Sequence, residues 1–184
     1  HCTRRRDGAW PGQSDEEYLD RLIWSDEQDH SALAALTSII KSQTLVAGSK
    51  ESEAATGVSF TETPLAELHQ LRTFRPHRGR WDFEPYGISI CQDWLTEHGA
   101  RPVLYRSSDE YSALSTEDQP YFQCQESHQG TNVIDWSIER EWRHVGELKL
   151  DELPSDRAMV FVPSLAEAQE IAQWSRWPVT VIGA

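Results

Sequence analysis

Residues 136–143, with the sequence WSIEREWR, hold the densest group of chemically active side chains in the chain. The segment reads as a strand, on which every second side chain points to the same face, so Glu139, Glu141 and Arg143 are expected together. If this face lines a cleft, the two like charges shift each other's pKa. One carboxylate could then act as a general base or stabilise positive charge developing on a sugar. If the face is solvated, the same residues make cross-strand ion pairs worth roughly 0.2–1 kcal/mol each.

Length, charge and composition narrow the class of protein. A chain of 184 residues fits a single domain, 1–184, with a real hydrophobic core. The net charge of −13 argues against sequence-independent binding to a phosphate backbone, which needs an excess of Lys and Arg. Eight tryptophans suggest that some of these amphipathic rings line a groove or an interface. Basic residues gather in two short windows, which are residues 4–6 and the set Arg72, Arg75, His77, Arg78 and Arg80. Each window indicates either a solvated loop or a site for an anion or a nucleotide.

Cysteine usage and hydropathy exclude several other classes. Cys2, Cys91 and Cys124 lack C-x-x-C spacing, which argues against a thiolate zinc site and against a disulfide framework. No apolar run approaches the roughly 18–20 residues that a membrane span needs, and no signal-peptide pattern opens the chain. We therefore expect a soluble cytoplasmic protein that does not bind a membrane.

Periodicity and capping signals predict the elements that position these residues. The capping boxes Ser14-x-x-Glu17 and Ser164-x-x-Glu167 open two helices. Further helices are expected at 31–42, 64–71 and 93–98, strands at 58–61, 86–91, 102–105, 158–162 and 179–182, and loops at 48–57 and 73–85. Strands this short and irregularly spaced do not form a doubly wound parallel sheet, so the sequence predicts an α+β fold.

Several short motifs in this order carry a family resemblance. They are His1-x-Thr3, the helix from Ser31, GVSFTETPL at 57–65, YGISI at 86–90, PVLY at 102–105 and EREWR at 139–143. Together they resemble AbiGi-like bacterial proteins of abortive phage infection. Those proteins in turn resemble the ADP-ribosyltransferase fold, in which a split, mostly antiparallel pair of sheets with flanking helices holds NAD in a central cleft. The resemblance implies an NAD-using enzyme that acts in phage defence.

The resemblance also implies which early residues would bind NAD. His1 matches the His or Arg of the family's first strand, whose side chain would hydrogen-bond the nicotinamide ribose, and Thr3 lies nearby in sequence. Ser59 or Thr61 matches the polar residue of the second strand. The chain lacks a clear Ser-Thr-Ser motif at this position.

The catalytic carboxylate of the family lies on a late strand and matches Glu141. Glu139 precedes it in the E-x-E spacing of transferases that modify arginine or other nucleophiles. Cleavage of the nicotinamide–ribose bond develops positive charge on the sugar, which a buried carboxylate can stabilise. Glu141 would hold the ribose 2′-OH, and Glu139 would take the proton from an acceptor, which could be nucleic acid, protein or water.

Arginine and tyrosine side chains are expected to complete the NAD site. Arg4, Arg75 or Arg78 would pair with the pyrophosphate as bidentate donors. Tyr86 or Tyr105 would stack on the nicotinamide or the adenine.

Two other classes of protein remain open. A metal-dependent nuclease would need an oxygen-rich Mg²⁺ site, for which the chain offers Asp82, Glu84, Asp135, Glu139 and Glu141. A non-catalytic partner or immunity protein would use an acidic surface and a tryptophan rim to bind another protein. Clustering of His1, Ser59 and Glu141 in one cleft would favour the transferase, whereas carboxylates gathered away from His1 would favour the metal site.

Overall fold

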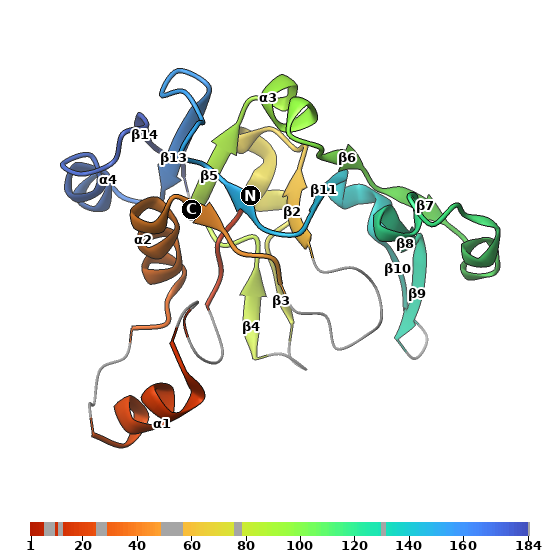
Figure 1. Ribbon diagram of the computed structural model, residues 1–184, viewed down its shortest axis with the longest axis horizontal. Helices are drawn as coiled ribbons and strands as arrows, with labels where there is room; N and C mark the ends of the chain where they lie inside the picture. The colour runs from red at the N-terminus through yellow and green to blue at the C-terminus, as the bar shows by residue number, and fades with distance from the viewer. Residues whose placement is uncertain are drawn as a thin grey trace.

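Two three-stranded sheets form the centre of the molecule (Figure 1). The computed structural model describes residues 1–5, 10, 13–24, 29–48, 57–75, 79–129 and 132–183. The first sheet has the antiparallel order β2 (Gly57–Thr61), β11 (Glu141–Val145), β6 (Arg101–Pro102). The second has the order β5 (Gly87–Ile90), β13 (Ala158–Val162), β14 (Val179–Val181), in which only the β13–β14 pair is parallel.

Residues 1–3 lie between the two sheets and connect them. Cys2 forms an antiparallel bridge with Gly87 of β5, and two backbone hydrogen bonds of 3.0 Å join His1 to Ile88. On the other side, His1 Nδ1 lies 2.8 Å from the carbonyl oxygen of Ser59 in β2. The outer strands β5 and β2 are therefore linked through this segment, and His1 lies at their junction.

Gly87 permits the close approach of residues 1–3 to β5. A Cβ atom at this position would collide with the carbonyl oxygen of His1 and lie 2.5 Å from the ring of Phe161. We expect Gly87→Ala to lower the free energy of unfolding by about 1–3 kcal/mol, because overpacking forces the backbone and ring to shift. Gly48→Ala is the control, since a Cβ there meets nothing within 4 Å. Urea unfolding measures both, and equal stabilities of the two variants would contradict the close contact.

The helices follow their local capping signals. In both predicted capping boxes, the serine accepts a hydrogen bond from the backbone N–H three residues on, at Ser14 and at Ser164. The helices are α1 (Asp15–Trp24), α2 (Ala32–Ser42), α3 (Gln92–Glu97) and α4 (Leu165–Ile171). The short α3 stops before Gly99, whose φ of 89° suits glycine in the left-handed region. The helices predicted at 14–24, 31–42 and 93–98 and the one after Ser164 are thus confirmed.

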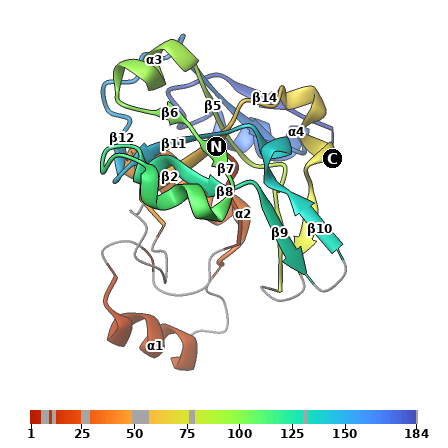
Figure 2. The ribbon, with the colours of Figure 1, turned by 90° about the vertical axis from the view of Figure 1, so that its right-hand side faces the viewer.

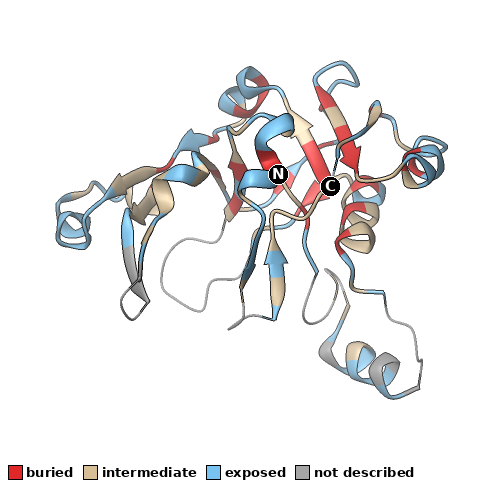
Figure 3. Ribbon diagram, turned by 180° about the vertical axis from the view of Figure 1, so that it is seen from behind, coloured by how far each residue is buried: buried red, intermediate tan, exposed pale blue. Residues whose placement is uncertain are grey.

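One hydrophobic cluster joins both sheets to α2, α3 and α4. It includes Leu36 of α2, Ile88 of β5 and Val160 of β13, all fully buried. Figure 3 shows the buried residues gathered on the central strands and on the helices that pack against them. Burying one such side chain stabilises the fold by roughly 1.5–3 kcal/mol relative to leaving it exposed. This shared core holds the two sheets, and therefore their junction at His1, in place.

Smaller strand pairs and 3₁₀ helices extend from this centre. Two antiparallel hairpins, β3 (Thr73–Arg75) with β4 (Arg80–Asp82) and β9 (Glu126–Gln129) with β10 (Asn132–Asp135), project from the same side of the molecule (Figures 1 and 2). The other pairs are the parallel β7 (Leu104–Arg106) and β8 (Phe122–Cys124) and the antiparallel β1 (Thr44–Leu45) and β12 (Leu148–Lys149). The 3₁₀ helices are η1 (Leu65–Gln70), η3 (Ser108–Ala113), η4 (Gln119–Tyr121) and η5 (Trp136–Glu139).

The strand predicted at 136–143 is wrong in its first half. Asp135 accepts hydrogen bonds from the backbone and hydroxyl of Ser137, which starts the 3₁₀ turn η5 instead. Arg140 then adopts a left-handed φ of 47°, and β11 begins only at Glu141. Glu139 therefore lies on a turn before the strand and does not share its alternation.

Other predictions agree with the structure to different degrees. Strands form within 58–61, 86–91, 158–162 and 179–182 as predicted. The segment 102–105 is divided between β6 and β7, which belong to different sheets, and the helix at 64–71 is of the 3₁₀ type. The predicted loop 73–85 is wrong, because it contains the β3–β4 hairpin. Most of the predicted loop 48–57 lies outside the described residues.

The mixture of helices with mostly antiparallel sheets confirms the α+β class. Across the described ranges, none of the helices combines the length and apolar character of a membrane span.

Candidate functional site

Glu141 lies at the centre of a polar network on one face of the β2–β11 pair. Arg143 is directly opposite Ser59, and Glu141 is opposite Thr61, so the antiparallel register places all four side chains on this face. The Ser59 hydroxyl donates to Glu141 Oε1 at 2.6 Å. Arg143 donates from Nε and Nη2 to the two carboxylate oxygens at 3.0–3.1 Å. The carboxylate is therefore oriented by donors from both strands.

Arg143 is itself fixed by the backbone around β8. The residue is only 3% exposed, and its Nη1 donates to the carbonyl oxygens of Pro120 at 2.7 Å and Phe122 at 3.2 Å. The side chain of Glu141 is 13% exposed. A nearly buried ion pair of this kind depends on the additional hydrogen bonds that satisfy the guanidinium. The network consequently holds Glu141 in one orientation.

Tyr105 approaches Glu141 from β7. Its hydroxyl oxygen accepts a hydrogen bond of 2.9 Å from the Glu141 backbone N–H. Burial, reinforced by the charges of Glu141 and Glu139, raises the pKa of Tyr105 to about 12. The phenol keeps its proton near neutral pH, and this proton can be donated to a ligand beside Glu141.

Glu139 lies close to the same network, although it is not on the strand. Thr61 Oγ1 donates to its carbonyl oxygen at 2.7 Å, and Arg75 Nη2 lies 3.6 Å from its carboxylate. Burial, followed by the charge of Glu141, raises the pKa of Glu139 to about 7, although Arg75 opposes the shift. A carboxylate with this pKa exchanges a proton near neutral pH, as a general acid or base requires.

The raised pKa of Glu139 predicts that the protein becomes less stable as the pH rises. Its folded-state pKa of about 7 exceeds the ordinary value of 4.5, so the folded protein binds this proton more tightly than the unfolded chain does. The stabilisation that comes from this proton is fully present below pH 4.5 and is lost as the pH rises through about 7. Between about pH 5 and pH 8, the wild type should lose up to about 3 kcal/mol relative to Glu139→Gln, whose amide does not titrate. Urea unfolding at several pH values measures this difference. Glu147→Gln, at a half-exposed ion pair, is the control, and parallel curves for wild type and Glu139→Gln would contradict the shift.

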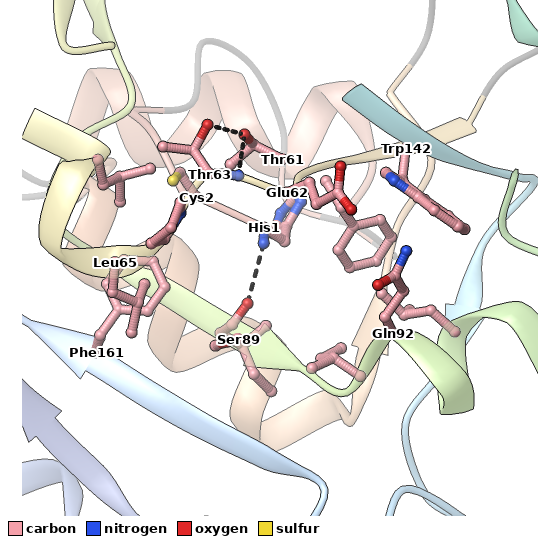
Figure 4. A pocket seen from close by; sticks show the side chains of 16 residues that line it. His1, Cys2, Thr61, Glu62, Thr63, Leu65, Ser89, Gln92, Trp142 and Phe161 are labelled. Carbon is pink, nitrogen blue, oxygen red and sulfur yellow. Dashed lines mark hydrogen bonds between the residues drawn. The ribbon is translucent and has the colours of Figure 1, made fainter. Parts of the chain in front are cut away.

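His1 connects the polar network to a pocket. Because a carbonyl oxygen only accepts, His1 Nδ1 carries the hydrogen in its bond to Ser59. The ring also lines a pocket of about 260 Å³ together with Phe60 and Trp142 (Figure 4). Phe60 and Trp142 are paired across β2 and β11 and alternate with Ser59 and Glu141, so they point to the opposite face. The pocket and the Glu141 carboxylate therefore lie on opposite faces of the pair.

No family model, curated protein or solved structure matches the chain.

Two predicted NAD-binding residues make internal hydrogen bonds through their hydroxyls. Thr3 is 3% exposed, and its hydroxyl donates to the carbonyl oxygen of Ala32 at 2.8 Å. The Tyr86 hydroxyl donates to Glu167 at 2.8 Å, and burial, followed by this bond, raises its pKa to about 12. Both hydroxyls are therefore occupied by internal partners. Stacking of the Tyr86 ring on NAD does not use its hydroxyl, so that contact stays a prediction.

The predicted arginines gather around Asp82. Arg75 Nε donates to Asp82 at 3.0 Å, and Arg4 Nη1 lies 3.9 Å from the same carboxylate. The Arg75 guanidinium also lies 4.9 Å from the ring centroid of Trp136. The side chain of Arg4 is 53% exposed, whereas that of Arg75 is 14% exposed. Arg4 is therefore more accessible to an anionic ligand, and Arg78 lies outside the described residues.

The proposed oxygen-rich metal site does not form in the described part of the chain. Within it, no group of three or more His, Cys, Asp or Glu side chains could hold a metal ion. Asp82 is instead paired with arginines.

Two contacts of the site were not predicted from the sequence. They are the hydrogen bond between the Tyr105 hydroxyl and the Glu141 backbone, and the bidentate pairing of Arg143 with Glu141. The i, i+2 spacing of Glu141 and Arg143 on a strand was the available signal for the second of these.

Proposed function

We propose that the chain is an ADP-ribosyltransferase-like enzyme of phage defence, which uses NAD to modify a macromolecule or hydrolyses it. The observation that carries this proposal is the chain of contacts from His1 through Ser59 to Glu141 at the junction of the two sheets. The predicted first-strand histidine, second-strand serine and late-strand glutamate come from segments far apart in sequence. His1 contacts the backbone of Ser59 and the Ser59 hydroxyl contacts Glu141, so the three residues are neighbours through Ser59, although the His1 pocket and the Glu141 carboxylate lie on opposite faces of the strand pair. This adjacency supports the AbiGi-like and ADP-ribosyltransferase-like resemblance.

The sheet arrangement supports the same proposal. The order β6, β11, β2, residues 1–3, β5, β13, β14 is a mostly antiparallel pair of sheets split at His1. An NAD site at this split would have Glu141 and Ser59 on one strand pair and His1 at its edge. This order and the sequence motifs support the proposed ADP-ribosyltransferase-like arrangement.

The residues around Glu141 suit the chemistry of NAD. NAD would supply the ADP-ribosyl group, with nicotinamide as its leaving group. Glu141 Oε2 receives a single hydrogen bond from Arg143 among the described contacts, which leaves acceptor capacity for a ribose hydroxyl. The negative charge of Glu141 would stabilise positive charge on the sugar, and Glu139, with its pKa of about 7, would accept a proton from the acceptor or from water.

Mass spectrometry of NAD incubated with the purified protein tests this proposal. The incubations contain the protein alone, or the protein with single-stranded DNA, RNA or a protein mixture. Release of nicotinamide supports the enzyme, and the mass added to one of these acceptors identifies its class. Absence of nicotinamide release under every condition would contradict the proposal.

A non-catalytic protein-binding module is the second candidate. The buried Glu141–Arg143 pair is compatible with it, because a purely structural ion pair would show the same bonds. Such a module would leave NAD unchanged while still depending on this pair for stability.

A further inference from the structure

The β3–β4 hairpin presents two aromatic rings to solvent. Phe74 is directly opposite Trp81, so both rings share one face, and their centroids are 5.3 Å apart. They are 44% and 43% exposed. On the other face, the side chains of Arg75, Arg80 and Asp82 are only 14–16% exposed and pair with one another. The hairpin therefore has a charged inner face and an exposed aromatic outer face.

Arg72 brings positive charge to this outer face in an otherwise acidic chain. The guanidinium of Arg72 lies 4.9 Å from the ring centroid of Trp81. Arg4, with a half-exposed side chain, reaches the inner face of the hairpin at Asp82. Residues 72–82 contain four arginines and one aspartate, whereas the whole chain has a net charge of −13. Exposed rings next to guanidinium groups fit a ligand that has both planar faces and negative charge.

We propose that the β3–β4 hairpin binds an unpaired nucleic-acid strand by stacking a base on Phe74 or Trp81. The strand must be unpaired, because the faces of its bases are hidden in a duplex. Arg72, beside Trp81, would contact a phosphate of the stacked strand. That this strand is the acceptor rests on the proposed function. On the inner face, Arg75 lies 3.6 Å from the carboxylate of Glu139, so the hairpin borders the group that would take the acceptor's proton.

Fluorescence anisotropy of a labelled oligonucleotide tests the binding without any reaction. The probes are single-stranded DNA and RNA of about 12 nucleotides, within the usual range of about 4–16 for single-strand sites, and the matching duplexes. We expect single strands to bind more tightly than duplexes and Phe74→Ala or Trp81→Ala to weaken that binding by about 5–100-fold. The DNA and RNA arms show which strand is preferred.

Trp174→Ala is the matched control. Trp174 is also a half-exposed tryptophan, at 38%, and Lys41 Nζ lies 5.6 Å from its ring centroid. The Trp174→Ala variant should bind the single strands as tightly as the wild type does. Because the aromatic pair also contributes to the hairpin, Phe74→Leu and Trp81→Leu are compared as well, since they keep an apolar cross-strand contact without a stacking plane. Thermal unfolding confirms that each variant is folded.

Several results would overturn the binding proposal. They are equal affinity of the leucine variants and the wild type, equal affinity for duplex and single strand, and Trp81-dependent binding of polyglutamate in place of oligonucleotide, which would indicate an acidic protein partner. Single-strand binding without NAD turnover would support binding at the β3–β4 hairpin and contradict the proposed NAD reaction. NAD turnover without single-strand binding would support the reaction and contradict binding at the hairpin.

Discussion

Glu141→Gln is expected to slow the release of nicotinamide from NAD by about 10²–10³-fold, the cost of removing one preorganised electrostatic group. Glutamine preserves the size of the side chain and one oxygen that can accept from Ser59 and Arg143. It removes the negative charge that would stabilise the sugar as its bond to nicotinamide breaks. Since the Glu141 side chain is only 13% exposed, little water can substitute for that charge.

Chromatography of released nicotinamide measures this loss. Glu147→Gln removes the same charge at an exposed ion pair, in which Glu147 Oε1 lies 3.1 Å from Lys149 Nζ, and should retain the rate of the wild type. Urea unfolding of both variants separates a catalytic loss from a folding defect. If Glu141→Gln is folded and turns over NAD as the wild type does, Glu141 is not the catalytic carboxylate.

Arg143→Met is expected to lower the free energy of unfolding by about 3–5 kcal/mol, because it leaves the carboxylate of Glu141 nearly buried and without its counter-charge. It also removes the donor that satisfies the carbonyl oxygens of Pro120 and Phe122. Buried acceptors that lose their partner add a desolvation penalty. Both terms act in the same direction, so this should be the largest stability effect among the arginines that the structure describes.

Urea denaturation with two comparison proteins tests this prediction. Arg106→Met removes an exposed arginine 3.9 Å from Glu110 and should cost no more than about 1 kcal/mol. The double variant Glu141→Leu/Arg143→Met carries neither buried charge and should recover much of the loss. Equal losses in Arg143→Met and Arg106→Met would show that the buried pair does not carry this stability.

The sequence alone determined the elements whose signals are local. The serine and glutamate of each capping box are three residues apart, so they set the starts of α1 and α4 without help from the rest of the chain. The strands near 58–61 and 158–162 follow from apolar residues with high strand propensity. Glu141 could be named as a candidate from its own short segment, whereas Ser59 was one of two alternatives, with Thr61, that the resemblance implied.

Contacts between distant segments determine which of these candidates lie together. Ser59 and Glu141 are 82 residues apart, and their contact depends on the pairing of β2 with β11. The left-handed Arg140 removes Glu139 from the strand, and the cross-strand pair of Phe74 and Trp81 forms where the sequence predicts a loop. Thr3 and Tyr86 have suitable chemistry but point to internal partners. Capping and alternation act over a few residues, whereas strand register and burial depend on contacts between distant segments, so a single sequence encodes the first openly and the second only through packing.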